Sequence, residues 1–165
     1  MRKRPTAQLL AGMVAGAVVS TVGAVQAGVR INLSPSMPKG LYQLVRCDET
    51  VGLDAAVGDR VAIDTKKASS NARLSFFRSL GWLSTSGRSD DILMKTVVGV
   101  GGDEVTEEDG RLHVNGTPLS RNASRRERVV GRLSLPSVEL PQRINEGEVW
   151  LSSGHEKGID SRYFG

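Results

Sequence analysis

Residues 92–116 read ILMKTVVGVGGDEVTEEDGRLHVNG, and this stretch decides the fold class. Its first nine residues are rich in β-branched side chains, which is typical of a strand. Asp109-Gly110 and Asn115-Gly116 then give two tight-turn signals around a short strand, so a hairpin is expected. Further short strands are expected at residues 41–47, 61–63 and 149–152. Short strands joined by glycine-containing turns predict a mostly β, antiparallel domain.

A single lysine, Lys95, lies between the apolar residues of the strand at 92–100. A lysine acts as a general base only when it is neutral, so its pKa of about 10.4 must fall by roughly three units. Burial among apolar side chains can lower the pKa in this way. Alternation along a strand allows Lys95 equally well to point into solvent. The sequence therefore offers Lys95 as a candidate base and as an ordinary surface lysine.

A candidate nucleophile lies upstream, in residues 32–42, which read NLSPSMPKGLY. Ser36 stands between Pro35 and Pro38, which restrict the backbone around it. A stiff turn suits a nucleophile, because attack requires a fixed geometry. The simpler interpretation is a turn that leads into a strand.

A serine nucleophile needs a base, and three residues are candidates. Lys95 is the first, and His155 with Asp160 would form the second in a Ser-His-Asp arrangement. His113 is less favoured, because it alternates with apolar residues in the expected hairpin. The two histidines have no metal-ligand spacing and the lone Cys47 forms no cluster, so no metal and no cofactor are expected.

The N-terminus combines a basic start with a long uncharged segment. Residues 2–4 are Arg-Lys-Arg, and residues 7–29 contain no charged side chain. Such a segment can cross a bilayer with its basic end in the cytoplasm. A cleaved signal peptide, with residues 25–27 as the small-residue site, and a buried helix of a soluble protein are the alternatives. We favour an uncleaved anchor, because cleavage would leave Ser36 near a frayed end.

The charge distribution and two clusters of side chains indicate whether nucleic acid or a membrane is the expected partner. The 165-residue chain has a formal charge of +4, with 22 basic and 18 acidic residues, and three of the basic residues are at positions 2–4. The basic balance therefore argues for membrane orientation and against nucleic acid as a partner. Residues 74–83 form an apolar patch, interpreted as a core-facing short helix or as a segment that enters the membrane interface. Residues 121–132 carry five arginines. We interpret this segment as a solvated loop or helix face, or as a segment that contacts anionic headgroups.

Three segments together resemble the type I signal peptidases. Residues 34–42 are similar to the serine box of that family, residues 94–103 (MKTVVGVGGD) to its lysine box, and residues 153–165 (SGHEKGIDSRYFG) to its third box. The boxes occur in the family's order. Residues 32–42 and the closing DSRYFG are typical of one branch, the TraF-type peptidases of conjugative transfer systems. Two features depart from the family pattern: Thr96 stands where the family usually has Arg, and the sequence ends at Gly165, where relatives continue.

The resemblance implies a serine peptidase with a Ser36–Lys95 dyad on a signal-peptidase-like antiparallel β domain. Ser34 would help the Ser36 backbone N–H to hold the oxyanion. Asp160, Ser161 and Arg162 match the third box, with Ser161 as the expected partner of Lys95 and an Asp160–Arg162 ion pair as the structural alternative.

The resemblance also implies a topology and a substrate. Residues 1–29 would anchor the chain in the inner membrane, and residues 30–165 would form a periplasmic peptidase domain with an insertion at residues 66–91. The implied partners are membrane lipid and a pilin precursor or another membrane-inserted polypeptide, whose ends some members join into a ring. A general type I signal peptidase and a non-catalytic membrane-anchored β module of a secretion assembly are the alternatives.

Overall fold

The computed structural model describes residues 23, 26–45, 54–83, 92–119, 129–130, 133–155 and 158–165. The chain divides into two compact units. Residues 29–33 and 39–45 belong to the smaller unit, whereas residues 34–38 and all described residues from 54 onward belong to the larger one. The segment that contains Ser36 is therefore part of the larger unit.

The smaller unit contains an antiparallel hairpin of β1 (Val29–Asn32) and β2 (Gly40–Gln43), in which Ile31 pairs with Leu41. One face of this hairpin is apolar and open to solvent. Ile31, Leu33, Leu41 and Val45 are 68%, 75%, 73% and 82% exposed, whereas Asn32 on the alternate face is buried. The usual order of a half-buried strand, with apolar residues inside and polar residues outside, is thus inverted.

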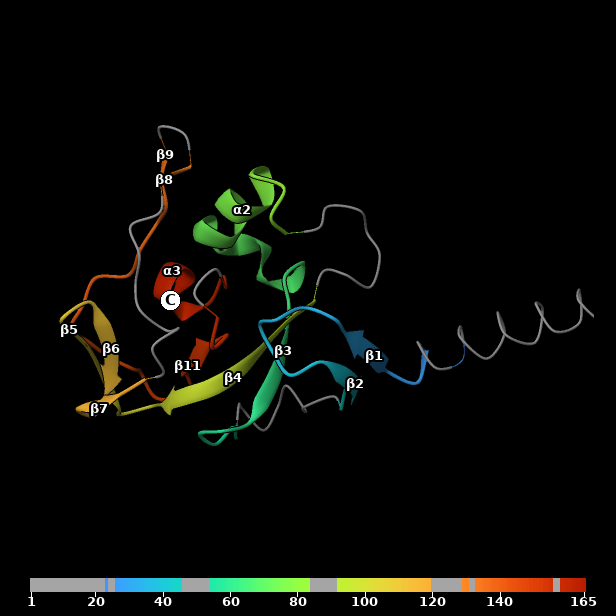
Figure 1. The fold of residues 1–165 in the computed structure, drawn as a ribbon, viewed down its shortest axis with the longest axis horizontal. Helices are drawn as coiled ribbons and strands as arrows, with labels where there is room; N and C mark the ends of the chain where they lie inside the picture. The colour runs from blue at the N-terminus through green and yellow to red at the C-terminus, as the bar shows by residue number, and fades with distance from the viewer. Residues whose placement is uncertain are drawn as a thin grey trace, which may run out of the picture. The chain divides into compact units, whose positions relative to one another are not determined.

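The first sheet of the larger unit has three antiparallel strands, in the order β11 (Val149–Ser152), β4 (Ile92–Val100) and β3 (Arg60–Asp64). Figure 1 shows β4 as its long central strand. The strands predicted at 92–100 and 149–152 are confirmed, and the one predicted at 61–63 extends by one residue at each end. On β4 the buried residues alternate as Lys95, Val97 and Gly99, so the lysine points to the same face as the core residues.

The second sheet contains the predicted hairpin. Its order is β10 (Gln142–Arg143), β5 (Glu104–Glu108), β6 (Arg111–Val114) and β7 (Thr117–Pro118). Both tight turns are confirmed, because Asp109-Gly110 and Asn115-Gly116 have positive φ at both central residues, as a type I′ turn requires. An apolar core fills this end of the unit, built from Val105, Leu112, Val114, Val138, Ile144 and Trp150.

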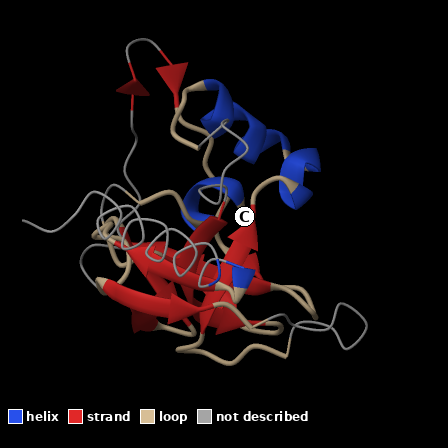
Figure 2. Cartoon of the chain, turned by 90° about the vertical axis from the view of Figure 1, so that its right-hand side faces the viewer, coloured by secondary structure: helices blue, strands red, loops and turns tan. Residues whose placement is uncertain are grey.

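The helices pack against one another in a second apolar core. In the described part of the larger unit they are η1 (Lys67–Ser70), α2 (Ala72–Ser79) and α3 (Ser161–Phe164), and Figures 1 and 2 show α2 near α3, beside the strands. Asn71 caps α2, accepting hydrogen bonds from the backbone N–H groups of Arg73 and Leu74 at 3.0 and 3.1 Å. The buried side chains of this core are Leu74, Phe77, Leu83, Tyr163 and Phe164.

The patch predicted at residues 74–83 therefore belongs to the apolar core, which agrees with its interpretation as a core-facing short helix. Most of residues 121–132 lie outside the described residues, apart from β8 (Val129–Val130), which pairs with β9 (Leu133–Ser134). Residues 1–22 of the predicted anchor also lie outside them. Within the part of the chain that the structure describes, no helix is both long and apolar enough to traverse a bilayer.

Candidate active site

The predicted nucleophile lies in a short segment, residues 34–38, between β1 and β2. The hydroxyl oxygens of Ser34 and Ser36 are 2.7 Å apart and share a hydrogen bond. Ser36 is half-buried, whereas Ser34 and both prolines are exposed. Met37 is the buried residue of the segment, with 5% of its surface exposed. The segment thus presents two adjacent hydroxyls while one apolar side chain is buried.

The predicted base, Lys95, is buried in the middle of β4 with 3% of its surface exposed. Of the two orientations that the sequence allowed, the structure has the buried one. Desolvation by burial is the main effect and lowers the pKa of Lys95; the Asp160 carboxylate acts in the opposite direction, and the Arg162 guanidinium lowers the pKa further. Burial therefore favours the neutral amine, the form that can accept a proton.

Asp160 and Arg162 form a buried ion pair with 0% and 2% of their surfaces exposed. Arg162 Nε donates to Asp160 Oδ1 at 2.6 Å, and its Nη2 donates to Asp160 Oδ2 at 2.7 Å. Ser153 also donates to Asp160 Oδ2, from its backbone N–H and from its hydroxyl, at 2.9 Å each. The carboxylate additionally caps α3 through the Arg162 N–H. The Asp160 carboxylate thus holds the loop after β11, caps α3 and binds the Arg162 guanidinium, which lowers the pKa of Lys95.

The hydroxyl oxygen of Ser161, the expected partner of Lys95, takes part in a backbone hydrogen bond. Its Oγ accepts a hydrogen bond from the backbone N–H of Leu151 at 3.0 Å, which fastens α3 to β11. The Asp160–Arg162 ion pair, named as the structural alternative, is present. The bond between Ser161 and Lys95 and the oxyanion role of Ser34 stay predictions.

The structure brings the nucleophile segment and the lysine strand into contact through their neighbouring residues. The Thr96 hydroxyl donates to Met37 Sδ at 3.5 Å, so the residue after Lys95 touches the residue after Ser36. The hydrogen bond of the Ser36 hydroxyl is the one with Ser34, and a direct bond to Lys95 stays a prediction. In serine hydrolases without substrate, such bonds are often long and tighten only when the substrate is bound.

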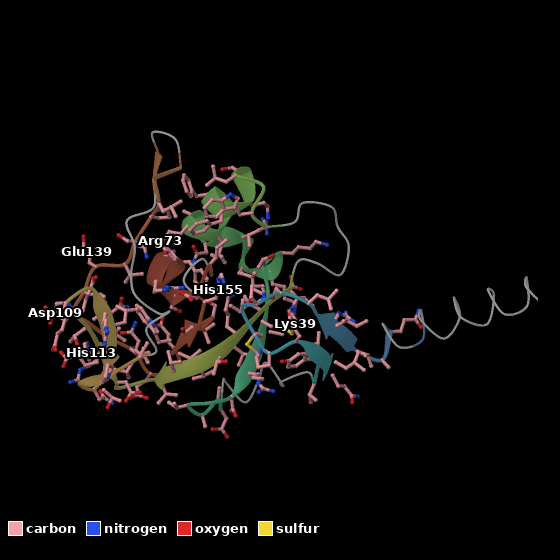
Figure 3. All side chains as sticks on the ribbon, in the orientation of Figure 1. Lys39, Arg73, Asp109, His113, Glu139 and His155 are labelled. Carbon is pink, nitrogen blue, oxygen red and sulfur yellow. The ribbon has the colours of Figure 1, made fainter. Side chains whose placement is uncertain are left out.

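The two histidines lie in different parts of the larger unit, as Figure 3 shows. His113 is on β6, in the second sheet. His155 follows β11, where its carbonyl accepts from Arg162 Nη2 at 3.0 Å and its N–H donates to Ser153 Oγ at 3.2 Å. Within the described ranges no three His, Cys, Asp or Glu side chains gather as metal ligands.

Sequence reasoning gave no role to two residues that hold the Asp160 network together. Ser153 links Asp160 to the loop at His155, since its hydroxyl also donates to the His155 carbonyl at 3.1 Å. Gly158 lies so close to Ser153 that any side chain would collide with it, and its carbonyl accepts from Arg162 Nη2 at 3.0 Å. The only signal in the sequence was their place inside the third box.

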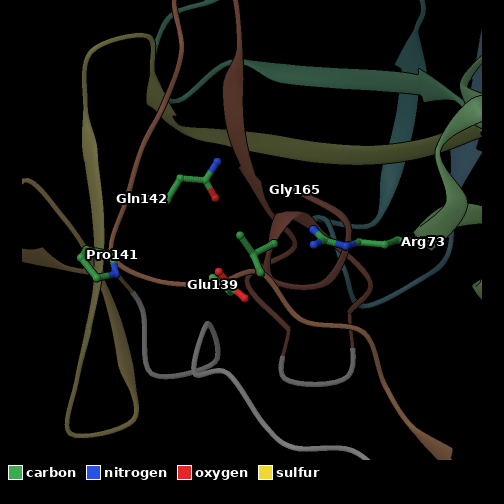
Figure 4. A pocket seen from close by; sticks show the side chains of 6 residues that line it. Arg73, Glu139, Pro141, Gln142 and Gly165 are labelled. Carbon is green, nitrogen blue, oxygen red and sulfur yellow. The ribbon is translucent and has the colours of Figure 1, made fainter.

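A separate hollow of about 420 Å³ lies next to α3, and Figure 4 shows it from close by. Neither Ser36 nor Lys95 is among the residues that line it, which are Arg73, Val138, Glu139, Pro141, Gln142 and Gly165. The hollow therefore has no part in the arrangement around Lys95.

The larger unit combines a buried lysine, a serine turn and a buried ion pair. The sequence profile of the family described as "Signal peptidase, peptidase S26" matches residues 4–165. The chain therefore belongs to the S26 signal peptidase family.

Two relatives of the chain point to one branch of that family. The chain is 33% identical, over 99% of its length and 85% of the relative, to a probable conjugal transfer protein TraF of Sinorhizobium fredii. It is 28% identical, over 100% of its length and 89% of the relative, to the conjugal transfer protein TraF of Agrobacterium tumefaciens. No solved structure matches. The protein is a conjugation-related, TraF-type signal-peptidase-like protein, as the sequence motifs predicted.

Proposed function

We propose that the protein is a membrane-anchored serine endopeptidase that uses a Ser36–Lys95 dyad to mature a conjugative pilin precursor. The observation that carries the proposal is the burial of Lys95 in β4, beside a residue that contacts the nucleophile segment. Burying a charged amine is unfavourable, so a buried lysine destabilises a protein that does not need it. In this chemistry, a lysine with a lowered pKa can serve as the general base.

In the acylation step, neutral Lys95 takes the proton from the Ser36 hydroxyl while Ser36 Oγ attacks the scissile carbonyl. The tetrahedral oxyanion is held by the Ser36 backbone N–H and by the Ser34 hydroxyl, which lies 2.7 Å from Ser36 Oγ. The Lys95 ammonium then gives its proton to the leaving amine, and the carbon–nitrogen bond breaks. An acyl ester on Ser36 remains.

The acyl ester has two fates. Attack by water, with Lys95 again as base, releases a free carboxylate and gives a linear product. Attack by an amine of the same substrate chain forms a peptide bond instead and gives a ring. Both routes regenerate the Ser36 hydroxyl, so one dyad serves hydrolysis and cyclisation.

The Asp160 carboxylate raises the pKa of Lys95 and the Arg162 guanidinium lowers it, so each offsets the other while burial lowers the pKa. Their ion pair also stiffens the loop that follows β11. The alternative base, His155 with Asp160, is less favoured, because both Asp160 oxygens bond to Arg162 and one also bonds to Ser153. An aspartate in a Ser-His-Asp arrangement must hold the imidazole.

The inner membrane and the periplasm are the proposed location. Residues 7–29 are uncharged, and an Arg-Lys-Arg sequence precedes them at positions 2–4. The first strand after this segment, β1, belongs to the hairpin whose outward face is apolar, with Ile31 and Leu41 at its centre. A lipid surface is a fitting neighbour for such a face, and the peptidase would then meet substrates that emerge from the bilayer.

A pilin precursor is the proposed substrate because both relatives are named as conjugal transfer proteins. To test this, the pilin precursor of the same transfer system is co-expressed with the full chain, and the product is examined by mass spectrometry. We expect a shortened, linear or circular pilin. Ser36→Ala and Lys95→Arg should each lower the rate by at least about a thousandfold, since the dyad acts as a unit.

Three outcomes would contradict the proposal in different ways. Unchanged processing by Ser36→Ala and Lys95→Arg would favour the non-catalytic module. Growth rescue of a strain depleted of its own signal peptidase, with no processing of the pilin precursor, would favour a general signal peptidase. If His155→Ala abolished processing while Lys95→Ala did not, the base would be His155.

A further inference from the structure

Thr96 is the position where the chain departs from the family pattern, and the sequence suggested no role for it. It lies at the point of β4 that is paired on both sides. Its register partner on β3 is Arg60, and its partner on β11 is Ser152. Ser152 precedes Ser153, which donates to Asp160. The sheet thus holds Thr96 in place: it follows Lys95 in the chain and lies opposite Ser152, whose neighbour Ser153 binds Asp160.

Met37 is the matching residue on the nucleophile segment. With 5% of its surface exposed it is the buried side chain of residues 34–38, and the Thr96 hydroxyl donates to its sulfur at 3.5 Å. Thioether sulfur is a weak acceptor that also packs well in apolar surroundings. The contact therefore combines burial with a directional bond.

We infer that the Thr96–Met37 contact positions Ser36 against Lys95, with Thr96 as a positioning residue of the dyad. The inference rests on the proposed function. Each partner is covalently next to a reacting residue, about 3.8 Å away along the chain. Pro35 and Pro38 restrict the backbone on both sides of Ser36, so a shift of Met37 moves the nucleophile too. A displacement of about 1 Å in such a geometry costs up to a hundredfold in rate.

The proposed role of Thr96 requires no contact between its side chain and that of Lys95. Side chains alternate along a strand, so Thr96 points to the face of β4 opposite to Lys95. Removing the Thr96 hydroxyl leaves the burial of Lys95 and the charges of Asp160 and Arg162 in place. The loss should appear in the maximal rate and should leave the pH dependence unchanged.

The test compares Thr96→Val with Thr96→Ser in the full chain. Valine keeps the branched shape and removes the donor, whereas serine keeps the hydroxyl. We expect Thr96→Val to lower kcat for cleavage of the pilin precursor by about three- to tenfold, as the loss of one modest hydrogen bond allows. KM and the pH midpoint of the activity curve should stay as in the wild type, and Thr96→Ser should retain most of kcat.

A double-mutant cycle with Met37→Leu tests the contact itself. Leucine keeps the apolar volume and removes the sulfur. Met37→Leu should cost less in the Thr96→Val background than in the wild type, because the shared bond is already lost. Thr106→Val, the same change on β5, is the control and should leave kcat unchanged.

Three results would overturn the inference: a wild-type kcat in Thr96→Val, an equal loss in Thr96→Ser, or strictly additive effects in the cycle. The thermal midpoint of each variant is measured alongside, and a kcat loss that merely follows the loss of folded protein would also overturn it. Ser36→Ala is run in the same assay. Activity in that variant would refute the dyad, whereas an inactive Ser36→Ala with a fully active Thr96→Val refutes only the positioning role.

Discussion

The burial of Lys95 carries a cost in stability that the residue's proposed role as the base would explain. Its amine is taken out of water on the buried face of β4, and the charge that would compensate it, Asp160, is already paired with Arg162. Removing one partner of a buried ion pair generally costs several kcal/mol. The pair therefore stays intact, and the lysine loses its proton more readily than a lysine in solvent.

The lowered pKa of Lys95 predicts a pH dependence of stability. Between the folded pKa and the ordinary value near 10.4, the unfolded chain holds a proton on Lys95 that the folded chain lacks. The free energy of unfolding should therefore rise with pH across this window, by at most about 1.4 kcal/mol per pH unit from this group. Below the folded pKa both states are protonated, and the slope from Lys95 disappears.

The measurement is urea unfolding of the detergent-solubilised wild type and Lys95→Met at several pH values from 6 to 10. Groups other than Lys95 titrate in both proteins, so their difference isolates the lysine. Lys66→Met, at an exposed position, is the matched control and should follow the wild type. Stability curves of the wild type and Lys95→Met that run parallel would show that Lys95 keeps its ordinary pKa.

At the level of elements, β4 is the centre of the larger unit because it pairs on both sides and contributes to its core. Gly99 sits where β11 has a register shift between Trp150 and Leu151. A Cβ at this position would lie 2.8 Å from Ile144 Cδ1 and 3.4 Å from the Trp150 Cβ. Because Gly99 has no side chain, Ile144 and Trp150 of the apolar core can pack directly against β4.

This close approach predicts a specific rescue. Gly99→Ala should destabilise the protein by about 1–3 kcal/mol through overpacking. Ile144→Val removes Cδ1 and alone should cost about 0.5–1.5 kcal/mol. In the Gly99→Ala background the same Ile144→Val change should instead be neutral or stabilising, because it removes the colliding atom. Denaturant unfolding of the four proteins measures the coupling, and simple additivity would contradict the packing argument.

How far the sequence predicts these elements depends on how local their signals are. The strand at 92–100 and both type I′ turns follow from neighbouring residues alone, and they are confirmed. β1 was missed because Val29 continues the uncharged run before it, so its strand character is hidden. α3 is only four residues long, too short for any helical period, and its one signal is the capping Asp160.

The sequence offers the candidate site residue by residue but not as a network. Ser36, Lys95, Asp160 and Arg162 stand in recognisable boxes, and the buried orientation of Lys95 was one of two open choices. The Ser153 bond to Asp160, the Gly158 close approach and the Thr96–Met37 contact depend on tertiary geometry. No periodicity or spacing encodes such contacts, so they had to be seen in the structure.

At the scale of the whole molecule, the N-terminal sequence predicts how the protein fractionates. Residues 7–26, if helical, would span about 30 Å, which matches the roughly 30 Å of a bilayer core. We expect most of the full chain to remain in the membrane pellet after an alkaline wash. Expression with a C-terminal tag followed by fractionation measures this, with a periplasmic enzyme as the control that washes off.

A tagged product that begins near residue 28 and appears in the soluble periplasmic fraction would contradict the anchor and favour a cleaved signal peptide. Replacing Arg2, Lys3 and Arg4 with neutral residues tests the orientation separately. We expect this change to reduce the fraction of chains whose C-terminal tag is on the periplasmic side, because basic flanking residues set membrane topology.

The layout of β4 has a practical consequence for laboratory evolution. Two residues on one face of a single strand, four positions apart, differ in what a substitution would change: substitutions at 99 would disturb core packing, whereas under the proposed function substitutions at 95 would also remove the base. A saturation library restricted to these two codons would calibrate a screen, since variants that lose abundance separate from variants that lose chemistry. Any selection for altered cleavage specificity could then be corrected for expression without purifying a single clone.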